Sequence, residues 1–248
     1  MCTLVLAWQA LADAPVAAAA TRDEAHDRPS RPPAVDEVAG TSVLAPRDER
    51  AGGTWLGVNE HGVFVALANR WTGRDLTADR SRGLLVDDAL TAGSADAAAE
   101  LVAEAVADTA YDGFWLVAAD AENAWLLGWD GGLDRRGLEP GVHVVVNVGA
   151  DGAFDVPPGR RAAGERQARG AQRARERLRV RDGETAASWR ERARAALADH
   201  DLGLCVHGDG YGTRSATLVT VGADGTVAMA HGEGPPCTAP VRAVEASI

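Results

Sequence analysis

Alternating apolar and polar positions divide the first part of the chain into short strand-like runs. TLVLAW (residues 3–8) and PVAAAA (15–20) flank a brief Ala-Asp turn, which predicts a hairpin or two neighbouring strands. GTWLGVN and GVFVALANRW lie on either side of Glu-His-Gly and predict a second hairpin. The chain therefore begins as a series of strands.

Two other parts of the chain have the periodicity of helices. LVDDAL (85–90) and the segment 94–109, which Ser94 caps, predict one pair of helices. Residues 160–199 are arginine-rich and amphipathic, and they predict a second pair. Because glutamates are interleaved with these arginines, we expect a solvated helix face there, not an arm that binds nucleic acid.

The remaining runs complete an α+β pattern. The proline-rich segment 28–37 predicts a loop, FWLVAA and AWLLGWD a third hairpin, and GVHVVVNVG a buried strand. TRSATLVTVGADGTVAMAH predicts two strands around an Asp-Gly turn. Strands and paired helices in separate blocks favour mostly antiparallel layers in a single domain over residues 1–248, not a βαβ array.

The charge balance limits the choice of partners. The 248 residues include 36 acidic and 25 basic side chains, a net charge of −11, and every basic one is arginine. Such an acidic chain lacks the basic face that nucleic acid requires. The absence of lysine also suits a halophilic cytoplasm, although a GC-rich genome would explain part of this bias.

The cysteines and the length of the apolar runs indicate a cytoplasmic protein. Cys2, Cys205 and Cys237 are odd in number and widely spaced, unlike a disulfide framework or a zinc signature. No apolar run approaches the ~18 residues of a membrane span. Asp13 interrupts the apolar N-terminal stretch, which has no basic region before it. We therefore expect neither a signal peptide nor stable membrane insertion.

Cys2 is the residue with the most distinctive chemistry. If Met1 is removed, Cys2 carries the free α-amine, whose ordinary pKa of about 7.7–8.0 lets it accept the thiol proton. One residue then supplies both nucleophile and base. Such a site still needs donors for the oxyanion and a charged group that orients the amine. A lipid anchor is not expected, since N-myristoylation requires glycine at this position.

Polar residues at strand ends supply candidates for these roles. Arg22 and Asp23 follow the strand that is expected to pair with the Cys2 strand. Asn69 and Asn147 end two apolar strands, where a buried amide is costly unless it is used. Each has a structural alternative, because Arg22 and Asp23 would also form an ordinary salt bridge and the asparagines would also close turns.

Four blocks of sequence resemble the NRDE family, also called the transport and Golgi organization protein 2 family. They are MCTLVLAW with TRDEAHDRP, RDERAGGTWLGVNEHGVFVALAN, RSRGLLVDDAL and YGTRSATLV. The family is named for Asn-Arg-Asp-Glu, and this chain has Thr21 in place of the asparagine. A second departure follows Asn147, where Val-Pro-Pro-Gly-Arg (156–160) replaces a Pro-Trp-Pro-Lys-like stretch.

The NRDE layout is similar to that of cysteine-type N-terminal nucleophile hydrolases such as bile-salt hydrolases and penicillin V acylases. This resemblance implies an αββα four-layer sandwich of two antiparallel sheets between helices. It also implies that Cys2 is the nucleophile and that Arg22 and Asp23 orient its amine. The reaction would be hydrolysis of an amide or thioester.

The same resemblance implies roles for three further residues. Asn69 and Asn147 would bind the oxyanion, and Arg214, which follows Gly-Tyr-Gly-Thr, would bind a charged group. Hydrolysis of this kind requires no cofactor or metal. The partner would be a small-molecule substrate, and the oligomeric state stays open.

The resemblance also offers a non-catalytic alternative, because animal members of the family resemble haem-trafficking factors and have been linked to acyl-CoA and lipid handling. A non-covalent haem or acyl-CoA pocket would be lined by Trp8, Trp55 and Trp71, residues that otherwise suit a core. The chain has no Cys-x-x-Cys-His motif, and its six histidines show no obvious ligand pairing. A third alternative is that Cys2 is only a buried strand residue.

Overall fold

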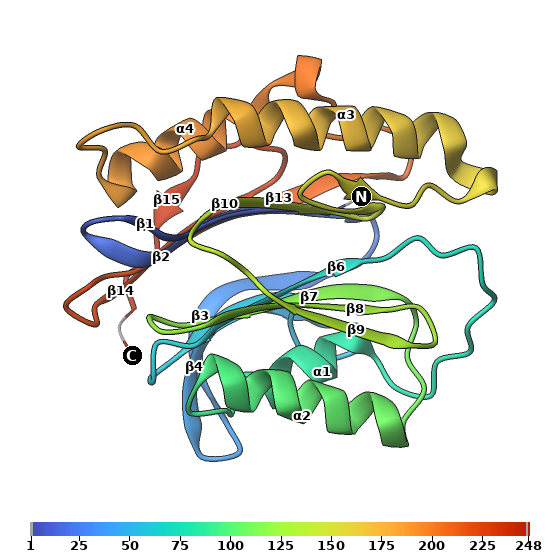
Figure 1. The fold of residues 1–248 in the computed structure, drawn as a ribbon, viewed down its shortest axis with the longest axis horizontal. Helices are drawn as coiled ribbons and strands as arrows, with labels where there is room; N and C mark the ends of the chain where they lie inside the picture. Colours follow the sequence, from blue (N-terminus) through green and yellow to red (C-terminus); the bar gives the residue numbers. More distant parts are fainter. Residues whose placement is uncertain (1, 247) are drawn as a thin grey trace.

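A computed structural model describes residues 2–246 and 248 of the chain. Two antiparallel sheets lie face to face, with one pair of helices outside each of them (Figure 1). This is the αββα sandwich that the resemblance implies, and the order of strands, two helices, strands, two helices and strands is also confirmed.

The first sheet has eight strands in the order β12-β11-β10-β1-β2-β13-β14-β15. Its centre consists of β1, β2 and β13, which are rich in valine, leucine and alanine and almost wholly buried. The strands are β1 (Thr3–Leu11), β2 (Ala14–Ala25), β10 (Gly141–Val146), β11 (Gly149–Ala150), β12 (Ala153–Phe154), β13 (Tyr211–Val221), β14 (Val227–Glu233) and β15 (Arg242–Ala243).

The second sheet has seven strands in the order β3-β4-β5-β6-β7-β8-β9, so each strand pairs with its neighbours along the chain. The predicted hairpins β5–β6 and β7–β8 are both present. The strands are β3 (Ser30–Val38), β4 (Thr41–Asp48), β5 (Leu56–Asn59), β6 (Phe64–Asn69), β7 (Phe114–Ala119), β8 (Ala124–Trp129) and β9 (Leu133–Gly137).

Two pairs of helices cover the outer faces (Figure 1). The second sheet carries α1 (Arg82–Ala89) and α2 (Ala95–Asp108), and Ser94 caps α2 as predicted by accepting the N–H of Ala97. The first sheet carries α3 (Arg161–Arg177) and α4 (Ala186–Ala198). Apart from Gln167, the buried face of α3 consists of glycine and alanine, which lets this arginine-rich helix lie close to β10.

Three apolar layers hold the sandwich together. One fills the space between the two sheets and includes Leu6, Phe64 and Trp8. The other two lie between each sheet and its helices, where Trp189 of α4 and Leu85 of α1 are fully buried. In the described part of the chain, no helix is both long and apolar enough to cross a membrane.

The prediction of a loop over residues 28–37 is wrong. These residues contribute most of β3, an edge strand that pairs with β4 alone in its sheet. Proline is tolerated on a sheet edge because its missing N–H is not needed for a second partner strand. The pairing register shifts between Arg31 and Ala34, where Pro32 and Pro33 lie. The prolines therefore interrupt the ladder locally without ending the strand.

Candidate functional site

Strand register brings Cys2 next to two of its predicted partners. β1 lies between β2 and β10, and its first residue, Thr3, pairs with Thr21 on one side and Val146 on the other. Cys2 precedes Thr3 in an antiparallel arrangement, so its neighbours are the residues after Thr21 and after Val146. These are Arg22 and Asn147.

Asn147 holds the backbone of Cys2. Its Oδ1 accepts the N–H of Cys2 at 3.2 Å and the Nε2–H of Gln167 at 3.0 Å. Its Nδ2 donates to the carbonyl oxygen of Asn69 at 2.5 Å. Asn147 and Gln167 are each 1% exposed, so this amide network is costly unless its groups are paired. The network joins the end of β10, α3 and the end of β6 at Cys2.

Asp23 lies against the thiol through its backbone. Its carbonyl oxygen is 4.0 Å from Sγ of Cys2 and accepts the hydroxyl of Tyr211 at 2.9 Å. Its carboxylate accepts the hydroxyl of Thr213 at 2.6 Å. Burial raises the pKa of Asp23 to about 6, although the Thr213 hydrogen bond opposes the shift. The carboxyl group therefore titrates near neutral pH.

Arg22 pairs with a residue that the sequence did not suggest. Its Nη2 donates to Oδ2 of Asp48 at 2.7 Å, and its guanidinium lies 4.5 Å from the ring centroid of Trp55. Arg28 donates to the same carboxylate at 2.7 Å. An ordinary Arg22–Asp23 salt bridge, the structural alternative considered above, is not among the ion pairs of the described residues. The strand alternation points the two side chains to opposite faces.

These residues line a small pocket of about 100 Å³. Cys2 lies in its wall with Arg22, Asp23 and Asn69, so four of the six predicted site residues share it. Asn147 contacts Cys2 and Asn69 behind this wall. Burial raises the pKa of the Cys2 thiol, so the thiol needs a base before it can act as a nucleophile.

Two glycine segments form another wall of the pocket. Gly53 has a φ of +75°, and a Cβ there would lie 2.3 Å from the carbonyl carbon of Gly83. The N–H of Thr54 donates to the carbonyl of Gly83 at 3.1 Å. Only glycine permits this contact, which joins the segment before β5 to the first turn of α1. The glycine pair therefore shapes the pocket beside Arg82, the first residue of α1.

Arg214 is the predicted site residue that the structure places elsewhere. It lines a different pocket, of about 730 Å³, together with His207 and His231. Thr213 and Arg214 are consecutive on β13, at a point where the pairing with β2 shifts register. Thr213 reaches Asp23, whereas Arg214 is not among the residues that line the Cys2 pocket.

With the geometry in place, comparison with known proteins gives a clear relationship. The family model described as Transport and Golgi organisation 2 matches residues 1–232. The chain belongs to this family. It is 31% identical to the bovine Transport and Golgi organization protein 2 homolog over 234 residues, which cover 84% of this chain and 83% of that protein. A mouse homolog is 36% identical over 107 residues, 41% of this chain and 37% of that protein.

Solved structures share the fold of this Transport and Golgi organisation 2 family member. Penicillin V acylase from Agrobacterium tumefaciens superposes with a TM-score of 0.58 at 13% identity, covering 96% of this chain and 84% of the acylase. The Caenorhabditis elegans ortholog of N-acylethanolamine-hydrolyzing acid amidase gives 0.56 at 12% identity, covering 88% and 92%. The family member thus has an N-terminal nucleophile hydrolase-like fold.

Sequence reasoning missed three residues of this family member's site. Asp48 and Arg82 lie within blocks that resemble the family, but nothing in those blocks shows that they meet Arg22 or the pocket wall. Gln167 left a clearer signal. It follows Gly164 and precedes Gly170 at three-residue spacing, so a polar side chain falls on the small, buried face of α3.

Three carboxyl groups line the Cys2 pocket, and one of them, Glu24, lies 3.8 Å from the guanidinium of Arg28. The carboxylate of Asp48 is shared by two arginines, and that of Asp23 accepts the Thr213 hydroxyl. Among the described residues, the group of side chains with ligand geometry lies outside this pocket, around Cys205 and Cys237. The Cys2 site therefore offers a nucleophile, carboxamides and guanidinium groups.

Proposed function

We propose that this family member hydrolyses an amide or thioester bond with Sγ of Cys2 as the nucleophile. The observation that carries the proposal is the convergence on Cys2 of Asn147, Asn69, Asp23 and Arg22 at one end of the sandwich. The amide network places groups that can orient an amine and bind an oxyanion beside a strand-end cysteine. The two solved structures described above are named as an acylase and an amidase, which favours the same class of reaction.

The first step needs a base, because burial raises the pKa of the Cys2 thiol. In this proposal, removal of Met1 frees the α-amine of Cys2, which takes the thiol proton while Sγ attacks the carbonyl carbon. Met1 lies outside the described residues. The nitrogen of Cys2 already donates to Asn147, so the amine would be held in place beside the thiol.

The same step needs donors for the carbonyl oxygen, which becomes negative as Sγ attacks. Each carboxamide nitrogen carries two hydrogens, and one hydrogen of Asn147 Nδ2 is used by the carbonyl of Asn69. The second hydrogen, with the side chain of Asn69 in the pocket wall, would bind the oxyanion. The ammonium group then returns its proton to the departing amine or thiol, and water cleaves the thioester on Cys2 to release the acid.

The charged residues would position the machinery. Asp23 would orient the amine from its place beside Cys2, and its protonation state would change near its pKa of about 6. Arg22, fixed between Asp48 and Trp55, would bind an anionic part of the substrate or order the pocket wall. A direct role for Arg214 would require a substrate that reaches the neighbouring pocket.

The size of the pocket limits the substrate. At about 100 Å³ it is smaller than the roughly 300–1,000 Å³ typical of sites that enclose a whole ligand. It suits the reacting bond and a short group, with the rest of the substrate lying outside. The same volume argues against a haem group at Cys2.

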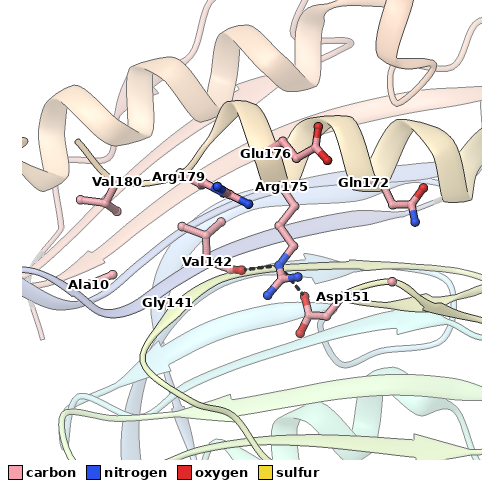
Figure 2. A pocket seen from close by; sticks show the side chains of 10 residues that line it. Ala10, Gly141, Val142, Asp151, Gln172, Arg175, Glu176, Arg179 and Val180 are labelled. Atoms are coloured by element: carbon pink, nitrogen blue, oxygen red, sulfur yellow. Dashed lines mark hydrogen bonds and ion pairs between the residues drawn. The ribbon is translucent and has the colours of Figure 1, made fainter.

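The alternative of a non-catalytic haem or acyl-CoA carrier would need a larger pocket. One of about 620 Å³ lies between α3 and the β10 edge (Figure 2). Arg175 and Arg179 line it, but Asp151 and Glu176 do too, and Arg175 is held by Asp151 and the carbonyl of Val142. The balanced charges do not favour a polyanionic ligand there.

The pocket of about 730 Å³ that contains Arg214 is also large enough, but Glu233 lines it beside Arg214, and its His207 lies at ligand distance from two thiols. Hydrolysis is therefore the better-supported proposal.

The proposal is tested first by the intact mass of the purified chain. A mass lacking one methionine is expected, because the mechanism needs the free amine of Cys2. Amide and acyl-thioester substrates are then screened with wild type, Cys2→Ala and Cys2→Ser. We expect hydrolysis by wild type and none by Cys2→Ala, with a matched exposed variant, His61→Ala, unaffected.

Two results would overturn this proposal. A mass that retains Met1 in active protein would exclude the amine as base. Hydrolysis that persists in Cys2→Ala would exclude the thiol as nucleophile. If no substrate is cleaved although Met1 is absent, titration with haem and with acyl-CoA, followed by tryptophan fluorescence, tests the carrier alternative.

A further inference from the structure

Four side chains with soft or nitrogen donors meet near the start of β13, outside the Cys2 pocket. They are His200, Cys205, His207 and Cys237. His200 begins the short 3-10 helix His200–Leu202, and the left-handed Gly203, with a φ of +65°, turns the chain back. Cys205 and His207 lie on the segment that leads into β13. Cys237 comes from the chain after β14, so three separate segments contribute.

The donor atoms are already at the spacing of a metal site. The two sulfur atoms are 3.6 Å apart, and Nε2 of His207 is 3.4 Å from Sγ of Cys205 and 3.3 Å from Sγ of Cys237. All four ligand atoms lie within 4.8 Å of one another. The rings of His200 and His207 stand edge to face with centroids 5.2 Å apart.

These distances match tetrahedral zinc. With Zn–S near 2.3 Å and Zn–N near 2.0–2.1 Å, tetrahedral angles place two sulfurs ~3.8 Å apart and a sulfur and a nitrogen ~3.6 Å apart. Two thiolates and two imidazoles are a donor set that suits Zn²⁺ better than the oxygen-seeking Mg²⁺ or Ca²⁺. A disulfide is a poorer account, because its sulfurs would be about 2.05 Å apart and it would leave both histidines unexplained.

We propose that His200, Cys205, His207 and Cys237 bind a zinc ion. Four protein ligands fill a tetrahedral shell and leave no position for water, which is the arrangement of a structural site rather than a catalytic one. Cys205 and His207 are two residues apart, and both side chains reach Sγ of Cys237. The expectation of no zinc signature rested on spacing along the chain, and the fold supplies the proximity that spacing does not.

The ion would hold together the segment that supports the catalytic candidates. Val206, between two of the ligands, exchanges hydrogen bonds with Thr213: its N–H donates to the Thr213 hydroxyl and its carbonyl accepts the Thr213 N–H, both at 2.9 Å. The same hydroxyl donates to Asp23, whose carbonyl lies against the Cys2 thiol. Zinc would thus fasten this segment to the chain after β14 and keep Thr213 on Asp23.

The test is the zinc content of the full chain. The protein is expressed with zinc in the medium and purified under reducing conditions without a polyhistidine tag. Gel filtration then removes loosely bound metal. We expect inductively coupled plasma mass spectrometry to find one zinc ion per chain. Cys205→Ser and Cys237→Ser should each lose most of it. Cys2→Ala is the matched control, because it also removes one thiol but should keep the full zinc content.

A second readout covers variants that fold poorly. Cobalt is bound in place of zinc, and thiolate ligation gives a sulfur-to-cobalt charge-transfer absorption that should weaken in Cys237→Ser and in His207→Ala, both at more exposed positions than Cys205. Two results would overturn the proposal: wild type grown with zinc that retains no metal under reducing conditions, or full zinc content in Cys237→Ser.

Discussion

This chain has two thiol sites, and their surroundings give them different chemistry. Around Cys2 lie the side chains of Arg22, Asp23 and Asn147, which supply guanidinium, carboxylate and carboxamide groups. Cys205 faces Cys237 and His207 at ligand distances. A single thiol beside oxygen and nitrogen groups is suited to attack a carbonyl, whereas paired thiols beside imidazoles are suited to bind a metal.

The comparison also shows where the two sites depend on each other. Thr213 is the connection, since its hydroxyl contacts Asp23 on the Cys2 side and the N–H of Val206 on the metal side. Variants on either side of Thr213 should therefore affect one site, while variants of Thr213 itself should affect both.

The largest effect is expected for Asp48→Ala, on the Cys2 side alone. It leaves the buried guanidinium of Arg22, whose side chain is 5% exposed, without its carboxylate. Loss of a partner from a buried ion pair lowers the free energy of unfolding by about 3–5 kcal/mol. Urea denaturation measures this change, and the zinc content should stay at the wild-type value.

The matched control for Asp48→Ala is Asp27→Ala, which breaks an exposed pair with Arg50. Exposed pairs contribute roughly 0–1 kcal/mol, so the control should unfold nearly like wild type. An equal decrease in the free energy of unfolding of the two variants would show that burial around Arg22 is not what makes Asp48 important.

The next effect is a pH dependence carried by Asp23. Its pKa in the folded chain is about 6 against 3.8 for the ordinary group, so the folded state binds the proton more tightly. Stability from this group is present below pH 3.8 and is lost as the pH rises through about 6. The difference corresponds to about 3 kcal/mol. Asp23→Asn removes this loss, so its free energy of unfolding should increase relative to wild type between pH 4 and pH 7.5.

Urea denaturation of both proteins at the two pH values is the measurement. A constant difference between them would contradict the raised pKa. The same variant should leave zinc content unchanged, because Asp23 is not among the proposed ligands.

A smaller effect on both sites is expected for Thr213→Val. The substitution removes the hydroxyl from the buried carboxyl group of Asp23, which costs about 1–3 kcal/mol. It also removes the hydroxyl from the part-buried N–H of Val206, which water can partly replace at a smaller cost. The pKa of Asp23 should rise further, measured by carboxyl NMR titration. Thr213→Ser keeps the hydroxyl and should restore both the stability and the pKa; failure to do so would assign the effect to packing.

The smallest effect is expected for Tyr211→Phe. Its hydroxyl donates to the carbonyl of Asp23 at 2.9 Å, but the residue is 39% exposed and water replaces the lost donor. We expect a loss of about 0.5 kcal/mol in urea denaturation and little change in the alkylation rate of Cys2. A decrease in the free energy of unfolding as large as that of Asp48→Ala would mean that the Tyr211 hydroxyl is essential to the pocket.

The fold was largely predictable because the apolar positions follow either the two-residue period of a strand or the 3.6-residue period of a helix, and clear turns separate these segments. The Asp-Gly turn at the β13–β14 hairpin and the Ser94 cap of α2 are local signals, and both are confirmed. The β3 strand was missed because Pro32 and Pro33 are typical of loops, and only its position on the sheet edge makes them acceptable. Edge position depends on the whole sheet and is not a local property.

The site was predictable where strand pairing, or an amide at the end of an apolar strand such as Asn69, pointed to it. Arg22 and Asn147 follow from pairing with β1, since both lie beside residues opposite Thr3. Asp48 and Gln167 reach the site from the other sheet and from a helix, so their contacts depend on how layers pack. The cluster of Cys205 and Cys237 was hidden for the same reason, because 32 residues separate its thiols.

The proline pair of β3 has a consequence for how molecules of this protein meet one another. An edge strand offers unpaired N–H and C=O groups on which a strand of a neighbouring molecule can add. Pro32 and Pro33 have no N–H to offer, and Asp36 and Glu37 place negative charge further along the same strand. A second copy that approached this edge would find an interrupted ladder and like charges. The second sheet is therefore protected on this side against growth into larger, self-templated assemblies.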